Sequence, residues 1–363
     1  MKQAAIAILI ILTMTLSGCL DLFVNTTTYE SHATNVSYSI RYGYEIESQG
    51  TGDYEIHYDC DYPEVLLGQI STPILLYNTE YEPISIGEND IVRWNISGAD
   101  TDSYTLGIST EITTEAFYIT DITGAHALTI QDIQTQHPEL MRQYTNAQAN
   151  DSATFIDPHN QQIKTIAEDI KQKTPTNNSY LLAKALFIWL KQNTDYKIHT
   201  TGDGGVQPAA VTFNKKTGDC DDLSYLYVSL CRAIKIPARF IRGYLIEEAN
   251  GIAQATSHAW TEIYVGATIG NNGWIPVECA SNSKNMDVQI HQNFGVEDVQ
   301  HLRLYTDSGT NESLILSMSG ISWKTYNQQI AVTATPFVDI ENYIIHEEQK
   351  LVITDDATRS YEQ

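Results

Sequence analysis

The chain has few cysteines for its length and few basic residues beside its acidic ones. Only five cysteines occur in 363 residues, which excludes a scaffold held by many disulfides, so hydrophobic cores must supply the stability. Lysine and arginine number 21 against 45 aspartate and glutamate residues, a formal charge of -24. So acidic a surface repels nucleic-acid phosphates and anionic lipid headgroups, and we expect no nucleic-acid partner. The sequence also contains no internal repeat and no low-complexity segment.

The N-terminus has the pattern of an export signal. Lys2 precedes an apolar run at 4–12, and Leu16-Ser17-Gly18-Cys19 resembles a lipobox. In signals of that kind the chain is cleaved before the cysteine, whose thiol carries diacylglycerol, so Cys19 would attach the protein to the membrane. The alternative is an uncleaved anchor, although residues 4–20 are short for about 30 Å of hydrocarbon. Both alternatives make residues 1–19 a signal or membrane anchor and predict an exported, membrane-anchored protein at the cell surface.

The first third of the chain has the alternating pattern of β-strands. Apolar residues occupy every second position over 36–46 and again over 54–62, with Gly50 and Gly52 between the two runs. This pattern predicts a hairpin of half-buried strands. Strand-like runs follow at 91–96, 103–109 and 117–122. We therefore expect an antiparallel β-sandwich domain at residues 30–140, with Cys60 on the buried face.

The hydrophobic period changes from two to about 3.6 near residue 157, which predicts helices over 163–170 and 179–193. A third helix is expected to begin at Cys220, with Asp219 as its N-cap and apolar residues at helical spacing up to Ile234. Short strand-like runs come next. Helices followed by a sheet predict an α+β domain at 155–300. Residues 301–363 are predicted to form a strand-containing C-terminal extension with an exposed tail.

A thiol, an imidazole and a carboxylate occur in order at the ends of these elements, as Cys220, His258 and Glu278. A thiol at a helix N-terminus lies at the positive end of the backbone dipoles, which favours the thiolate. An acid beyond the imidazole would fix its tautomer. His258 and Glu278 fall on neighbouring predicted strands and can face the same helix end if the register suits. The three residues are therefore a candidate nucleophile, base and acid.

Three features bear on this assignment. The carboxylates of Asp219, Asp221 and Asp222 oppose thiolate formation unless they point into caps or ion pairs. A zinc site drawn from Cys220, His258, Cys231 and Cys279 would lack closely spaced ligand pairs, so no metal or other cofactor is predicted. Cys231 and Cys279 are the pair to test for a disulfide, because pairing Cys220 would destroy the nucleophile.

Several linked motifs resemble the transglutaminase-like superfamily over residues 158–285. They are Gly218-Asp219-Cys220, Arg232-Ala233, Ile236-Pro237-Ala238-Arg239, Gly243-Tyr244, His258-Ala259-Trp260 and Trp274-Ile275-Pro276-Val277-Glu278. The resemblance implies a papain-like core of helices packed on an antiparallel sheet. It also implies Cys220 as nucleophile, His258 as general base and acid, and Glu278 at the acid position, where most members carry Asp. Together with the N-terminus, it suggests an archaeal or bacterial exported lipoprotein.

The residues and the resemblance lead to three hypotheses. The first is an exported, membrane-tethered cysteine hydrolase that cleaves peptide or amide bonds through a thioester acyl-enzyme. The second is a transglutaminase, in which a lysine amine resolves the same thioester. The third is a non-catalytic surface binding protein that uses the β-sandwich. For the enzyme hypotheses, the backbone N–H of Cys220 is one candidate oxyanion donor and Tyr196 a second.

Overall fold

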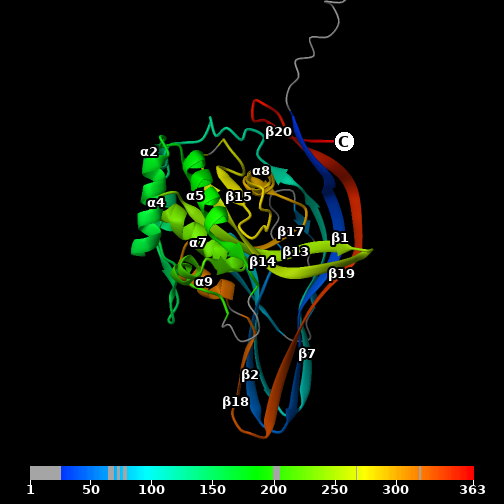
Figure 1. Ribbon diagram of the computed structural model, residues 1–363. Coiled ribbons are helices and arrows are strands. Elements are labelled where there is room, and N and C mark those ends of the chain that lie inside the picture. Colours follow the sequence, from blue (N-terminus) through cyan, green and yellow to red (C-terminus); the bar gives the residue numbers. More distant parts are fainter. Residues whose placement is uncertain are drawn as a thin grey trace, which may run out of the picture.

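The computed structural model describes residues 26–63, 69–71, 74–76, 80–198, 205–266, 268–318 and 320–363. The predicted signal or anchor at 1–19, including Cys19, lies outside the described residues. Within the described ranges, no helix is both long enough and apolar enough to cross a membrane. Helices and antiparallel sheets occur together (Figure 1), which confirms the predicted α+β fold class.

Two antiparallel sheets form the β-sandwich. The first has the order β20-β19-β1-β7-β3, with β4 also on β7, and the second has the order β18-β2-β6-β5. Alternate side chains of β1, such as Val36, Tyr38 and Ile40, are buried in the core between the sheets, as the alternation predicted. The strands are β1 (Thr27–Gly50), β2 (Asp53–Asp61), β3 (Ile70–Ser71), β4 (Ile74–Leu76), β5 (Glu82–Ile86), β6 (Asn89–Ala99), β7 (Asp102–Glu115), β18 (Ser322–Thr325), β19 (Ile330–Ile353) and β20 (Arg359–Glu362).

The predicted hairpin between the first two strands is wrong. β1 and β2 follow each other in the chain, but they belong to different sheets: β1 pairs with β7 and β19, and β2 pairs with β6 and β18. Alternation specifies that one face of a strand is buried, but it does not specify which strand forms the ladder. The turn at residues 51–52 therefore carries the chain from one sheet to the other.

The C-terminal residues complete the sandwich. β19 pairs with β1 from Gly50–Ile330 to Thr27–Ile353, so the first and last long strands lie side by side (Figure 1). The tail that was predicted to be exposed instead forms β20, and Arg359 is fully buried there. Its guanidinium donates to the carbonyl oxygens of Ile119, Gly295, Ile290 and Phe294. A buried cation with four carbonyl acceptors fixes the chain end instead of leaving it frayed.

Helices cover one face of a third sheet, whose order is β15-β14-β13-β17 (Figure 1). The central helix α7 contacts α4, α5, α6 and strands β13 and β14. Its predicted apolar stripe is buried in this contact. The strands are β13 (Ala238–Ala249), β14 (Ile252–Tyr264), β15 (Trp274–Val277) and β17 (His301–Thr306), and the helices are α2 (Ile130–Gln136), α3 (Pro138–Tyr144), α4 (Gln161–Lys173), α5 (Ser179–Asn193), α6 (Ala209–Lys215), α7 (Cys220–Ala233), α8 (Met286–Asn293) and α9 (Asn311–Met318).

The third sheet lies between the helices and the sandwich. Ile246, Leu302 and Leu304 of this sheet share a hydrophobic core with the sandwich strands, and β14 contacts β19. Ile263 and Ile275 pack instead in the core with α7. Both faces of the sheet are therefore covered, which holds the strands that carry His258 and Glu278 rigidly.

Several short elements were not predicted. Helices α2, α3, α6 and α8 fall in segments without a strong helical period, and α9 lies in the C-terminal region for which strands were predicted. The remaining strands pair in twos: β8 (Phe117–Tyr118) with β16 (Val296–Glu297), β9 (Gln148–Ala149) with β10 (Thr154–Ile156), and β11 (Asp195–Tyr196) with β12 (Thr217–Gly218). Short runs of a few residues carry too little pattern to be separated from loops.

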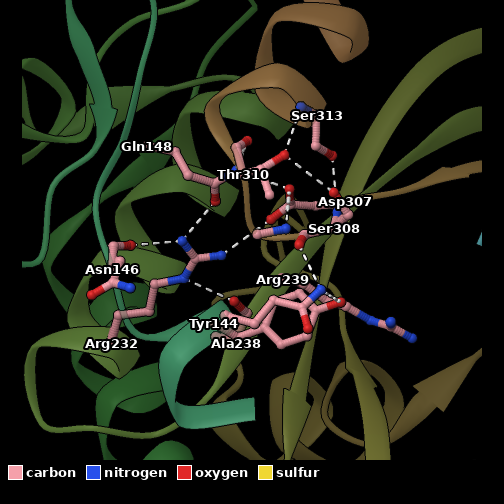
Figure 2. Close-up of polar contacts among 12 residues, drawn as sticks. Tyr144, Asn146, Gln148, Arg232, Ala238, Arg239, Asp307, Ser308, Thr310 and Ser313 are labelled. Atoms are coloured by element: carbon pink, nitrogen blue, oxygen red, sulfur yellow. Dashed lines mark hydrogen bonds and ion pairs between the residues drawn. The ribbon is translucent and has the colours of Figure 1, made fainter. Parts of the chain in front are cut away.

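A saturated ionic cluster holds the C-terminal end of α7 (Figure 2). Arg232 donates from Nε to the carbonyl of Ala238 at 2.9 Å, and from one terminal nitrogen to the Asn146 carbonyl and the Gln148 side chain. Its other terminal nitrogen lies 3.1 Å from Asp307, and both side chains are 0% exposed. Gln148 in turn donates to Asp307 at 2.9 Å. These bonds tie α7 to the loop that follows β17.

Candidate active site

Cys220 is the first residue of α7, as predicted. The backbone N–H of Leu223 donates to the Asp219 carbonyl at 3.1 Å, and the Asp219 N–H donates to the Asp222 side chain at 3.3 Å. The helix therefore begins directly after Asp219, whose backbone has an extended conformation. This start places the thiol of Cys220, which is partly exposed, at the positive end of the helix dipole.

The first turn of α7 lies against β14 beside His258. The Cys220 thiol accepts a hydrogen bond from the backbone of Ala259. One turn further along, Ser224 Oγ donates to the Ala259 carbonyl at 3.4 Å. Because Ala259 directly follows His258, these two contacts align the thiol with the imidazole-bearing residue.

His258 and Glu278 form a close pair across neighbouring strands. The distance from His258 Nε2 to Glu278 Oε2 is 2.7 Å. β14 pairs with β15 from Tyr264–Trp274 to Thr261–Val277, and Glu278 follows the last residue of β15. The other carboxylate oxygen of Glu278 accepts the backbone N–H of Ala280. The longer side chain of glutamate therefore reaches His258 without disturbing the strand register.

A second histidine, absent from the sequence-based prediction, shares the same carboxylate. His301 Nε2 lies 3.1 Å from Glu278 Oε2, and His301 Nδ1 lies 2.8 Å from Asp298 Oδ1. His301 begins β17, which is separated from β15 by the two strands β14 and β13 in the sheet. Only the three-residue spacing of Asp298 and His301 was visible in the sequence, and it is too common a spacing to indicate a site.

The charges of this cluster shift several pKa values. Burial raises the pKa of Glu278, but the charges and hydrogen bonds of His258 and His301 outweigh burial and hold it well below its usual range. Burial lowers the pKa of His301, yet Asp298 and Glu278 raise it well above its ordinary value. His301 is therefore an imidazolium at neutral pH, with one N–H donated to each carboxylate.

The three acids beside Cys220 do not act alike. Asp222 is fully buried and accepts from the backbone N–H and the side-chain amide of Gln207, at 2.6 and 2.5 Å. Burial, and the hydrogen bond that the protonated Asp221 carboxyl donates to Asp219, raise the pKa of Asp221 to about 9, so Asp221 carries a proton at neutral pH and shares it with Asp219. Burial, followed by the charge of Asp221, raises the pKa of Cys220 to about 12. The expected thiolate is not favoured, because burial opposes its charge.

A cleft of about 510 Å³ reaches His258, Glu278 and His301. Its lining residues come from β11, β13, β14, α8, the start of β17 and the segments that follow β15 and precede β17. They include Tyr196, Leu245, Glu247, His258, Glu278 and His301. Tyr196 pairs with Gly218 through the parallel strands β11 and β12. Tyr196, the predicted second oxyanion donor, therefore lies beside Gly218, which precedes Cys220 by two residues, and it also lines the cleft.

Trp260 and a buried ionic network form the floor beneath the two histidines. The Trp260 ring stacks on His258 at 5.9 Å between centroids and meets His301 edge-on at 4.8 Å. Its indole N–H donates to Glu297 at 2.7 Å, and Arg303 bridges Glu297 and Glu262. Since these groups are buried and paired, they hold the Trp260 ring in place, with His258 stacked on it and His301 packed edge-on against it.

The other described cysteines are buried free thiols. Cys60, Cys231 and Cys279 are each nearly or fully buried, and no disulfide forms among the described cysteines. The disulfide between Cys231 and Cys279 that the sequence analysis considered is therefore not formed. Cys60 lies in the sandwich core as a small hydrophobic residue, as expected.

Comparisons with known proteins identify the family of one domain and a similar overall fold. The family model described as transglutaminase-like superfamily matches residues 164–279. No curated protein matches the chain. A candidate cysteine protease of known structure from Cytophaga hutchinsonii is 15% identical with a TM-score of 0.54, covering 93% of this chain and 96% of that one. At this identity the similarity shows the fold alone.

Two further solved structures are less similar. A candidate protease from Parabacteroides distasonis is 10% identical with a TM-score of 0.27, covering 78% of this chain and 48% of that one. The periplasmic domain of TgpA from Pseudomonas aeruginosa is 13% identical with a TM-score of 0.35, covering 72% of this chain and 99% of that one.

Proposed function

We propose that this chain, whose residues 164–279 form a transglutaminase-like domain, is a cysteine hydrolase that cleaves peptide or amide bonds. The observation that carries the proposal is the 2.7 Å pair of His258 and Glu278 beside a thiol at the start of α7. A nucleophile, a base and an orienting acid are the groups that acyl transfer through a thioester requires. The similar fold of a protein described as a candidate cysteine protease supports the same reaction class.

The contacts of His258 suggest how the proton moves. Because Nε2 donates to Glu278, Nδ1 is the nitrogen left to accept the proton of Cys220. The neutral thiol transfers this proton as its sulfur attacks the substrate carbonyl carbon. His258 then gives the proton to the leaving amine, which breaks the C–N bond and leaves a thioester. A water molecule, deprotonated by His258, attacks the thioester and releases the acid product and the thiol.

Two groups are proposed to stabilise the tetrahedral oxyanion. The backbone N–H of Cys220 lies in the first helical turn, where no intrahelical acceptor exists. The phenol of Tyr196 lines the cleft, and burial followed by the charge of Cys220 raises its pKa to about 12, so it remains a donor at neutral pH. Donors already in place lower the cost of developing charge in the transition state.

The site of action is proposed to be outside the cytoplasm. The N-terminal pattern ending in Leu16-Ser17-Gly18-Cys19 supports export and attachment to the membrane through lipid on Cys19, or through an uncleaved anchor. Peptides or proteins at the cell surface would then be the substrates. The bacterial or archaeal lipoprotein assignment remains part of this proposal.

One experiment separates the hydrolase from the two other hypotheses. The protein without residues 1–19 is incubated with a peptide library and a labelled primary amine. New amino termini are expected, and they support hydrolysis. Label entering peptide glutamine would show that an amine resolves the thioester, as in a transglutaminase. If neither product forms and iodoacetamide does not alkylate Cys220, the enzyme proposal is wrong and the binding hypothesis gains support.

A further inference from the structure

The two histidines and the glutamate of the cleft converge on one point. His258 Nε2 and His301 Nε2 lie 2.7 and 3.1 Å from the same oxygen of Glu278. The three donor atoms all lie within 4.8 Å of one another. In a tetrahedral Zn²⁺ site with bonds near 2.0–2.1 Å, ligand atoms are separated by about 3.3 Å. Both contacts to Glu278 are shorter than that separation, so small side-chain rotations that open them would make room for an ion between the three donor atoms.

The surroundings of His301 are those of a metal ligand. Its Nδ1 donates to Asp298 Oδ1 at 2.8 Å, and such a carboxylate behind a histidine fixes ring orientation and basicity in metal sites. Trp260 packs against both imidazoles and holds their planes. Glu278 is held in turn by the backbone N–H of Ala280. His301 and Glu278 are thus held by hydrogen bonds behind their donor atoms, and His258 is held by the stacked ring of Trp260.

The cleft supplies an entry path and a favourable charge. His258, Glu278, Asp298 and His301 all line it, so a hydrated ion can reach the three donor atoms. Among the described lining residues none is lysine or arginine, and Glu247 adds another carboxylate. Two imidazoles and one carboxylate match the preference of Zn²⁺, and the cleft leaves a fourth position for water.

We infer that His258, Glu278 and His301 form a binding site for Zn²⁺, and that the bound ion inhibits the hydrolase reversibly. Coordination through Nε2 releases one proton from the His301 imidazolium, whereas the neutral His258 must move its proton from Nε2 to Nδ1, where it blocks the nitrogen that would accept the thiol proton. Zn²⁺ would also occupy the Glu278 oxygen that orients His258, so the imidazole could no longer cycle a proton with Cys220. The inhibition rests on the proposed function, whereas the binding of the ion does not.

The test measures metal binding on protein that carries Cys220→Ala, since a thiol is itself a strong zinc ligand. Isothermal titration with Zn²⁺ is expected to show one site per chain, unchanged in affinity by Cys220→Ala. Co²⁺ is expected to give a tetrahedral absorption spectrum without a sulfur charge-transfer band. Loss of binding in Cys220→Ala would overturn the inference and assign the metal to Cys220 with Asp219 and Asp221, whose donor atoms also cluster.

Two variants and a matched control locate the site. In the Cys220→Ala background, His301→Gln is expected to weaken Zn²⁺ binding by at least about tenfold, and Asp298→Asn by about 10–100-fold. His291→Gln is the control, because His291 bonds to Tyr29 outside the cleft and should leave the affinity unchanged. Circular dichroism checks that each variant is folded. If His301→Gln does not fold, the result for Asp298→Asn is the test. Wild-type affinity in a folded variant of either residue would overturn the inference.

An activity measurement then separates the two proposals. Micromolar Zn²⁺ is expected to inhibit peptide hydrolysis by the wild-type protein, and a chelator should restore it. Binding without inhibition, in a protein that does hydrolyse peptides, would overturn the inhibitory role alone. Binding in a protein that hydrolyses nothing would contradict the proposed function and leave the metal site standing.

Discussion

Two buried ionic clusters lie at opposite ends of α7, and they differ in how fully their polar atoms are used. At the C-terminal end, Arg232 and Asp307 are 0% exposed, and each guanidinium nitrogen of Arg232 has an acceptor (Figure 2). At the N-terminal end, one oxygen of Glu278 serves two histidines and the cluster opens to a cleft. A saturated cluster stabilises one conformation, whereas a shared oxygen beside a cleft leaves protons free to move.

The charge states of the buried groups also differ between the two ends of α7. Burial lowers the pKa of Arg232, and the nearby Asp307 opposes that effect, so Arg232 keeps its positive charge. Around Cys220, by contrast, burial and Asp221 hold the thiol protonated and Asp221 itself shares a proton with Asp219. The C-terminal cluster should therefore control stability, and the N-terminal cluster should control reactivity.

The strongest test of this division is removal of the nucleophile or base. Cys220→Ala and His258→Ala are each expected to lower kcat for peptide hydrolysis by about 10⁴-fold or more, because the two groups act as one unit. The melting temperature should change little. Hydrolysis assays and calorimetry on the same samples check both expectations, and turnover retained by Cys220→Ala would refute the assignment.

The acid should matter less than the nucleophile. Glu278→Ala is expected to lower kcat by about 10²–10⁴-fold and to leave measurable activity, since His258 remains beside Cys220 but loses its orienting partner. Glu278→Asp serves as the conservative control and should recover part of the loss. If Glu278→Ala and the wild-type protein hydrolyse a peptide substrate at equal rates, the assignment of Glu278 as the acid is wrong.

At the other end of α7 the expected change is in stability. Asp307→Ala should lower the free energy of unfolding by about 3–5 kcal/mol, because it leaves the buried Arg232 unpaired. Asp339→Ala is the control, because its ion pair with Arg41 is exposed and should contribute less than about 1 kcal/mol. Urea denaturation gives both values. Similar losses for the two variants would contradict the structural role of the Arg232 cluster.

The smallest effect should come from the acid next to the thiol. Ionised Asp221 raises the pKa of Cys220, so Asp221→Asn should lower that pKa and speed alkylation by iodoacetamide several-fold above about pH 9, where the wild-type acid ionises. Below that pH Asp221 already holds a proton, and the two rates should converge. Rates that differ equally at pH 7 and pH 10 would exclude proton sharing with Asp219.

The sequence predicted the individual elements better than their partners. Helical spacing located the start of α7 at Cys220, and alternation located the strand that became β1. The pairing of β1 with β19 could not be predicted, because the alternation of apolar residues in a strand does not specify which strand pairs with it. The triad positions lie in motifs with distinctive spacing, whereas His301 and Asp298 join the site only through the order of strands in the sheet.

The effect of burial on Cys220 also needed the structure. A helix N-terminus and three neighbouring acids were readable in the sequence, and they act in opposite directions on the thiol. Which effect dominates depends on side-chain orientation: Asp222 turns to Gln207, while Asp221 bonds to Asp219. Residue order alone could not determine these directions.

The pairing of β1 with β19 has a consequence for synthesis of the chain. One edge of β1 is paired with β7 early, but the other edge finds its partner only when residues 330–353 have been made. Until then a 24-residue strand exposes a free row of backbone donors and acceptors. Such an edge invites pairing with other chains, and contacts so distant in sequence form slowly. Pairing with β19 therefore closes an edge at which a nascent molecule could otherwise aggregate.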